Sequence, residues 1–172
     1  YKQGDFTEDA WTLFADESSR DVIARIEAVD TTLKDFVSID QGVVPNPVRL
    51  TPAKYEKLPQ ESIRMGVKKG QGVFVLSIEE VDSLSLKENE YEIIKPFYKN
   101  SDIGRYITAS TTDKRLIYSS AETEINDFPN IKKHLDKFRS ILMKRRECEE
   151  GKIPWYSLHW SRNPMNFEGE EL

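Results

Sequence analysis

The sequence feature that most constrains the fold is an apolar repeat in the last third of the chain. Ile131, Leu135, Phe138 and Leu142 follow one another at steps of four, three and four residues. This is the spacing of one face of an α-helix. We therefore expect a long amphipathic helix over about residues 130–149, which packs on a core by its apolar side.

Cationic side chains flank this apolar face in two rows along the expected helix. The first row is Lys132, Arg139 and Arg146, and the second is Lys133, Lys137 and Lys144. A strongly positive surface of this kind suits a phosphate backbone. We therefore expect the first row to face phosphate.

Length and composition limit the possible classes of protein. The chain has 172 residues, enough for one domain or two small lobes. No apolar run is as long as a membrane span, and no signal-peptide pattern is present. Cys148 is the single cysteine, which excludes an internal disulfide framework and a zinc site of several thiolates. We expect a reducing, cytoplasmic location and, from the ends Tyr1 and Glu-Glu-Leu, a piece of a larger protein.

The formal net charge of -5 hides an uneven distribution of charge. Residues 95–146 contain twelve Lys and Arg against six Asp and Glu, whereas the remainder contains thirteen against twenty-four. A binding surface responds to the local field, because charges beyond about 8–10 Å are screened by salt. The positive segment is therefore compatible with a nucleic-acid partner.

The predicted fold class is α+β, with a small mixed, partly antiparallel sheet. The expected strands are residues 37–44, 73–77, 105–109 and 115–118. The expected helices are residues 1–15, about 20–31 and about 130–149. Residues 110–114 connect two of these strands as a hairpin, which would place Lys114 and Arg115 near its tip.

Three further segments have local sequence signals of short helices or turns. Thr51 and Pro52 suit the cap and first position of a short helix that ends before Pro59. Residues 89–100 suggest a helical turn interrupted by Pro96. The glycines of residues 66–72 lead into a strand and not into a helix, so a turn is favoured over a phosphate-binding loop.

The chain carries few signs of catalytic chemistry. His134 and His159 have no partners at metal-ligand spacing and are expected to be packed. Cys148 lies among acidic residues that disfavour its thiolate. The pairs Glu79–Glu80 and Glu149–Glu150 are expected to be solvated. These patterns favour a binding module, with no catalytic or metal-ligating residue and no cofactor of its own.

Two segments are candidates for recognition. Residues 41–49 contain one glycine and two prolines, which favour an extended loop that is either a plain connection or a recognition loop. The second candidate is an aromatic cluster of Trp155, Tyr156, His159 and Trp160, followed by Arg162 and Asn163. The aromatic side chains either stack on bases or close the core, whereas Arg162 and Asn163 suit base edges.

Several motifs together resemble one family. They are QGVVPNP at 41–47, GVKKGQGVFVL at 66–76, KPFYKNSDIGRY at 95–106, FPNIKKHL at 128–135, and the run from RRE to WYSLHW at 145–160. In this order they resemble the TaqI-like C-terminal specificity domain of type IIG restriction–modification enzymes. The resemblance extends from about residue 33 to residue 167.

The resemblance implies a DNA target recognition domain. Such a domain holds duplex DNA and reads its sequence for an adjoining adenine-N6 methyltransferase, which flips the adenine and uses S-adenosylmethionine. This chain lacks the Asn-Pro-Pro-Tyr motif, the glycine-rich cofactor motif and the nuclease pattern of such enzymes, so no activity of its own is expected. Residues 1–32 would form a connecting segment with a helix. Residues 33–172 would form the recognition domain, truncated at its C-terminus.

The expected partners are double-stranded DNA and the methyltransferase domain of the same polypeptide, with no membrane. The expected DNA-binding residues are Gln41, Asn46, Arg49, Lys68, Lys69, Lys99, Asn100, Ser101, Arg105, Tyr106, Lys114, Arg115, Lys132, Arg139, Arg146, Arg162 and Asn163. The alternative function is a protein-interaction or subunit-docking domain that uses the basic helix.

Overall fold

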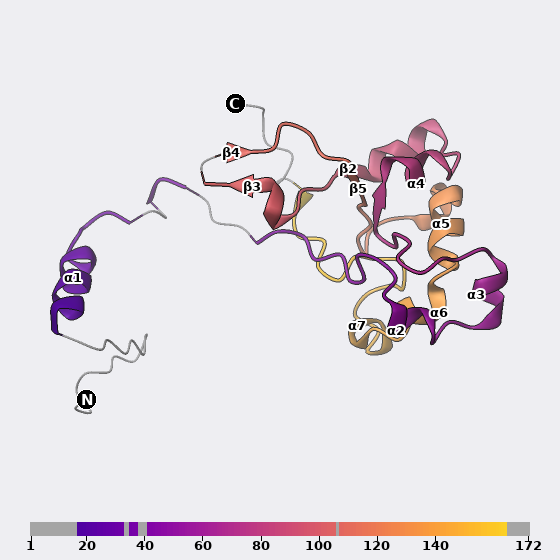
Figure 1. Ribbon diagram of the computed structural model, residues 1–172, viewed down its shortest axis with the longest axis horizontal. Helices are drawn as coiled ribbons and strands as arrows, with labels where there is room; N and C mark the ends of the chain where they lie inside the picture. The colour runs from indigo at the N-terminus through magenta and orange to yellow at the C-terminus, as the bar shows by residue number, and fades with distance from the viewer. Residues whose placement is uncertain (1–16, 33–34, 38–40, 106, 165–172) are drawn as a thin grey trace. The chain divides into compact units, whose positions relative to one another are not determined.

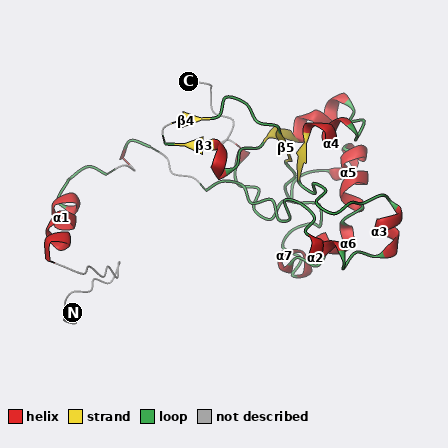
Figure 2. Ribbon diagram, in the orientation of Figure 1, coloured by secondary structure: helices red, strands yellow, loops and turns green. Residues whose placement is uncertain are grey.

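A computed structural model of the chain describes residues 17–32, 35–37, 41–105 and 107–164. The chain divides into two compact units, residues 1–40 and residues 41–172 (Figure 1). The fold is mixed α+β, with several helices and a small three-stranded antiparallel sheet (Figure 2). Within the described residues, no helix has the length and apolar character needed to cross a membrane.

The first unit contains one described helix, α1 (Glu17–Glu27). It begins about three residues earlier than predicted and also ends earlier. Its apolar residues Val22 and Ile26 are exposed, as is Val29 just beyond its end. The helix expected over residues 1–15 lies outside the described part of the chain.

The sheet of the second unit has the order β1 (Val75–Ser77), β5 (Lys114–Ile117) and β2 (Ile94–Pro96). Both neighbouring pairs are antiparallel. The predictions of strands near residues 73–77 and 115–118 are therefore confirmed. Of the strand expected over residues 37–44, the described part makes only an isolated bridge, at Val44.

The predicted hairpin between residues 105–109 and 115–118 is wrong. β4 (Ile107–Thr108) pairs instead with β3 (Ile103–Gly104), as a separate two-stranded sheet. The segment before β5 is drawn toward β2, because the Thr112 hydroxyl donates to the Phe97 carbonyl at 2.8 Å. Lys114 and Arg115 therefore lie in the middle strand and not at a hairpin tip.

The helical turn predicted over residues 89–100 is present in its first part, and strand β2 replaces it around Pro96. A 3₁₀ helix, η3 (Glu88–Ile93), ends where the backbone of Ile94 becomes extended. Pro96 lacks an N–H group but is accommodated because β2 is an edge strand. A second 3₁₀ helix, η4 (Asn100–Asp102), follows it.

The second unit also contains several short helices. As predicted, Thr51 caps α2 (Pro52–Tyr55), its side chain accepting from the Lys54 amide. The other short helices of this part are α3 (Gln60–Arg64), α4 (Ile78–Asp82) and the 3₁₀ helix η5 (Ile125–Asp127). Gly66 and Gly70 have positive φ angles of 80° and 77°, which agrees with the predicted turn.

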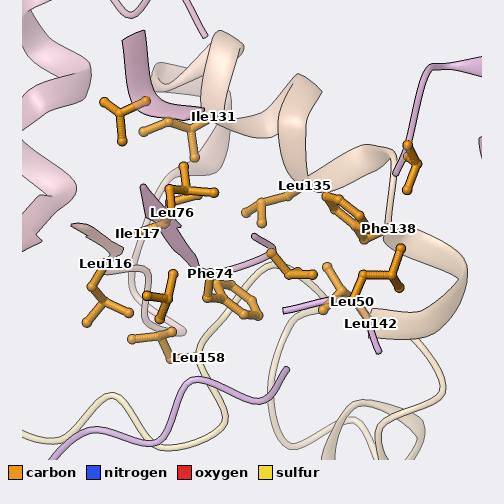
Figure 3. Packing of buried hydrophobic residues seen from close by; sticks show 14 of the residues in the cluster. Leu50, Phe74, Leu76, Leu116, Ile117, Ile131, Leu135, Phe138, Leu142 and Leu158 are labelled. Atoms are coloured by element: carbon orange, nitrogen blue, oxygen red, sulfur yellow. The ribbon is translucent and has the colours of Figure 1, made fainter. Parts of the chain in front are cut away.

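The core forms between the sheet and the apolar repeat. Ile131, Leu135, Phe138 and Leu142 are all fully buried, as their spacing predicts. Figure 3 shows them around Phe74, together with side chains of the sheet. Burying a side chain of this size contributes about 1.5–3 kcal/mol, so this cluster is a major source of stability.

The single long helix predicted over residues 130–149 is wrong. The segment forms three helices, α5 (Pro129–Asp136), α6 (Arg139–Leu142) and α7 (Arg146–Glu149). The first break is at Phe138, whose φ and ψ angles are -108° and 4°. The second is at Arg145, whose backbone is extended, with φ and ψ of -70° and 136°.

Candidate functional site

Four segments of the second unit meet around a cavity of about 900 Å³. Its lining residues are Gly42, Val43, Val48, Lys95, Pro96, Phe97, Tyr98, Lys99, Asn100, Ile103, Leu116, Tyr118 and Pro164. Most of these walls are apolar, and the polar groups come from the 95–100 segment. The volume of this cavity is within the usual range for a pocket that binds a small molecule or a group of similar size.

The loop of residues 41–49 is held in place by backbone pairing. The Val44 amide donates to the Trp160 carbonyl at 3.0 Å, and the Trp160 amide donates back at 3.3 Å. Pro45 and Pro47 are buried, and the peptide bond between Asn46 and Pro47 is cis. The loop is therefore a fixed wall of the cavity.

Arg145 joins this loop to the aromatic segment. Its guanidinium donates to the carbonyls of Asn46 at 3.1 Å, Ser157 at 2.8 Å and Trp155 at 2.7 Å. Its Nε also donates to the Leu142 carbonyl at 3.0 Å, where α6 ends. The side chain is only 8% exposed, and this burial lowers the pKa of Arg145. Sequence reasoning missed this residue, because its four acceptors are backbone carbonyls that no motif encodes.

Gln41 and Arg162, both predicted recognition residues, are brought together by the fold. The Arg162 guanidinium donates to the Gln41 side-chain oxygen and lies 4.7 Å from the centre of the Trp160 ring. The Tyr118 hydroxyl donates to the Arg162 carbonyl at 2.9 Å. Arg162 has a positive φ of 61°, uncommon for a residue with a side chain. Trp160 is 50% exposed, so it presents an aromatic face beside a cation.

Two predicted residues of the 95–106 motif line the cavity. Lys99 and Asn100 are both exposed, and Asp102 accepts a hydrogen bond from the Lys99 amide at 2.8 Å. Ser101 donates to the same carboxylate at 3.2 Å. Arg105 is exposed in the turn between β3 and β4, and Tyr106 lies outside the described residues.

Other predicted residues are engaged elsewhere. The Arg49 guanidinium donates to Glu80 at 3.0 Å. Glu80 is half-buried and not simply solvated as predicted: burial would raise its pKa, but hydrogen bonds from Gly72, Ser77 and Arg49 hold the pKa below its usual value. Lys68 is exposed on the glycine turn, and Lys69 lies 5.4 Å from the Tyr55 ring centre.

Lys114 and Arg115 are half-buried in β5. Lys114 pairs with Asp113 at 2.7 Å. The Arg115 guanidinium donates to the carbonyls of Thr112 and Lys114 at 2.8 Å and 3.0 Å. Neither cation is directed outward from a hairpin tip as predicted.

The first cationic row is divided among the three short helices. Lys132 donates to Asn126 at 2.8 Å. Arg139 lies 3.7 Å from Asp136 and 4.9 Å from the Trp155 ring centre. Arg146 donates to Glu150 at 2.9 Å. The continuous positive helix face predicted from the sequence is therefore absent from the described residues, because the helix breaks twice.

The N-terminal turn of α5 is occupied by the Glu90 carboxylate. Glu90 is fully buried and accepts hydrogen bonds from the amides of Asn130 at 2.7 Å and Ile131 at 3.1 Å. It also accepts from the Lys87 amide at 2.9 Å and the Asn130 side chain at 2.6 Å. Burial alone would raise the pKa of Glu90, but these hydrogen bonds outweigh it and lower the pKa. This helix end is therefore satisfied from within the protein.

The two histidines are packed. His134 is 2% exposed, and its Nε2 lies 3.0 Å from the Val73 carbonyl. Burial lowers the pKa of His134 to about 4, so the ring is neutral at pH 7. His159 is half-buried, with its Nδ1 3.2 Å from Glu147. Trp155 packs against the core, which agrees with one of its two proposed roles.

Within the described residues, no group of three or more His, Cys, Asp or Glu side chains could hold a metal ion. Cys148 is a free, half-buried thiol. Asn163 is exposed near the cavity wall formed by Pro164. The described arrangement is suited to binding through apolar, aromatic and cationic groups.

No protein-family model matches this chain, and no curated protein matches it in sequence.

Proposed function

We propose that the chain is a duplex-DNA target recognition module that sets the sequence specificity of an adjoining adenine-N6 methyltransferase domain. The observation that carries this proposal is the meeting of three motif segments around one cavity. Residues 42–48, 95–100 and 160–164 lie far apart in sequence, but each of these segments contributes at least one lining residue, the third through Pro164. The third segment is also joined to the first by the Val44–Trp160 bridge.

The exposed groups near this cavity suit both kinds of contact that DNA recognition needs. Lys99 and Arg105 are exposed cations on adjoining segments, which suits phosphate contacts that position the duplex. Arg162 lies beside Gln41 and Trp160, so a guanidinium, an amide and an aromatic face are close together. Arginine suits the guanine edge and glutamine the adenine edge in the major groove.

In this proposal the methyl transfer belongs to the parent polypeptide, which is cytoplasmic and uses S-adenosylmethionine. Some parents of this type also carry a restriction endonuclease domain. The present chain supplies binding and orientation only, and holds no cofactor itself.

A transplant tests this function. The segment replaces the corresponding recognition domain of a methyltransferase of the resembled family, and the methylated adenines are mapped on genomic DNA. A new recognition sequence supports the proposal. An unchanged recognition sequence with normal activity contradicts it. A control chimera with Arg162→Ala should methylate fewer sites or different sites, at a cost of about 1–3 kcal/mol in base discrimination.

One observation favours the alternative of a protein-docking domain. Ile103 and Ile107, on the small β3–β4 hairpin, are 53% and 74% exposed. The register pairs Ile103 with Thr108 and Ile107 with Gly104, so the two apolar side chains lie on opposite faces of the hairpin, and each face offers an apolar contact to a partner domain. In this alternative, replacing both residues by serine would weaken attachment to the partner domain and leave duplex affinity unchanged.

A further inference from the structure

We propose a phosphate-binding pocket between the 41–49 loop, α2 and α6. A cavity of about 340 Å³ is lined there by Asn46, Lys54, Lys57, Ser140, Lys144 and Arg145, with Ile141. It shares no lining residue with the cavity of about 900 Å³. Lys54, Lys57 and Ser140 were not predicted to bind a ligand, and Lys144 belongs to the second cationic row described from the sequence.

The pocket has an uncompensated positive charge. Four of its lining side chains are cationic, and none is a carboxylate. The ammonium groups of Lys54, Lys57 and Lys144 make no hydrogen bond or ion pair with any described residue, unlike the cations of the first row. Like charges held together repel, so an anion in the pocket would relieve that repulsion.

Two further groups indicate what the anion would contact. The Ser140 hydroxyl is buried and has no hydrogen-bond partner in the described structure. A buried hydroxyl without a partner is uncommon, and rotation of the Ser140 side chain toward the cavity that it lines would let a ligand oxygen satisfy it. Arg145 already donates to four carbonyls. It therefore adds positive charge to the pocket but has few N–H groups left to donate to a ligand. Burial and then repulsion from Arg145 lower the pKa of Lys54, which agrees with this crowding of cations.

The chemistry of these groups indicates a phosphate group as the ligand. Three flexible lysines are compact point charges with several donors each, which suits the oxygens of a phosphate. The volume is near the lower limit for small-molecule sites, so a phosphate with part of its parent molecule fits. The phosphate could belong to a DNA backbone or to a free phosphorylated molecule. The pocket does not rest on the proposed function, because inorganic phosphate alone should bind it.

The test is an NMR or calorimetric titration of the full chain with inorganic phosphate, at constant ionic strength set with chloride. We expect saturable binding that weakens about tenfold or more in Lys54→Gln/Lys144→Gln, because two charge-assisted hydrogen bonds are lost. Ser140→Ala should weaken binding less. The control Lys87→Gln/Lys152→Gln removes the same charge outside the pocket and should bind as the wild type does.

Duplex DNA added to the phosphate complex distinguishes the two sources. Displacement of phosphate by duplex assigns the pocket to a backbone phosphate. Continued phosphate binding in the presence of duplex assigns it to a free phosphorylated molecule, whether or not the proposed DNA function holds. Absence of saturable phosphate binding, or equal loss in the control variant, overturns the pocket.

Discussion

The Arg145 guanidinium donates a hydrogen bond at 3.1 Å to the carbonyl of Asn46, which lies 99 residues earlier in the chain. The same guanidinium binds the carbonyls of Ser157 and Trp155, so one side chain fixes the loop and the aromatic segment together. The geometry of both recognition segments therefore depends on a residue that need not contact any ligand.

Replacing Arg145 by methionine should destabilise the protein by about 3 kcal/mol or more, because four carbonyls lose a charged donor and those of Leu142 and Ser157 lose it in buried surroundings. Urea unfolding measures this change. The neighbouring Arg146→Met is a matched control, since its single ion pair with Glu150 is exposed and should cost less than about 1 kcal/mol. Equal effects of the two substitutions would contradict the structural role of Arg145.

Replacing Glu90 by glutamine should change the acid dependence of stability. The hydrogen bonds at α5 lower the folded-state pKa of Glu90 below its unfolded value, about 4.3. The carboxylate therefore stabilises the fold above that pH, and this contribution is lost as pH falls through the folded-state pKa. Wild type should lose more stability than Glu90→Gln between about pH 5 and pH 2.5.

The pH profile of the unfolding free energy also defines the contrary result. If Glu90→Gln follows the wild-type profile, the carboxylate does not cap α5 in its ionised form.

The buried His134 should make stability depend on pH in a higher pH range than Glu90 does. Its folded-state pKa of about 4 lies below the ordinary value of 6.5. The contribution of His134 to the free energy of unfolding is therefore fully present above pH 6.5. It falls as the pH drops toward 4, because only the unfolded state takes up the proton in that range. The total loss from this group should be roughly 3 kcal/mol.

An NMR titration of the His134 ring should show its midpoint near pH 4, if the protein remains folded. His134→Gln should flatten the stability profile between pH 6.5 and about pH 4.5, because the neutral amide takes up no proton in either state. A midpoint of His134 near 6.5 would contradict its burial against Val73.

The apolar repeat shows what local patterning can and cannot predict. The burial of Ile131, Leu135, Phe138 and Leu142 followed from their spacing, because the hydrophobic effect acts on each side chain. The breaks in the helix did not follow from it. The second break places Arg145 among carbonyls from distant parts of the chain, and such long-range contacts outweigh local helix propensity.

In the sheet and the candidate site, too, the local sequence predicts some features and the fold alone creates others. The apolar run at residues 73–76 predicted a buried strand, whereas β2 is three residues long with a proline and is recognisable only by its pairing with β5. Single residues of the candidate site were predicted in two ways, Arg162 from residue chemistry and Gln41 from the family resemblance. Their contact across 121 positions required the fold.

The most direct test of the proposed DNA recognition is duplex affinity measured by fluorescence anisotropy between about 50 and 200 mM salt. It compares two triple variants that each lose three positive charges. Lys99→Gln/Arg105→Gln/Arg162→Gln changes the cavity region, and Lys132→Gln/Arg139→Gln/Arg146→Gln changes the short helices. We predict that wild type binds duplex, that the first variant loses affinity and salt dependence, and that the second stays near wild type. Absence of duplex binding by the wild type, or a greater loss in the second variant than in the first, would contradict the account.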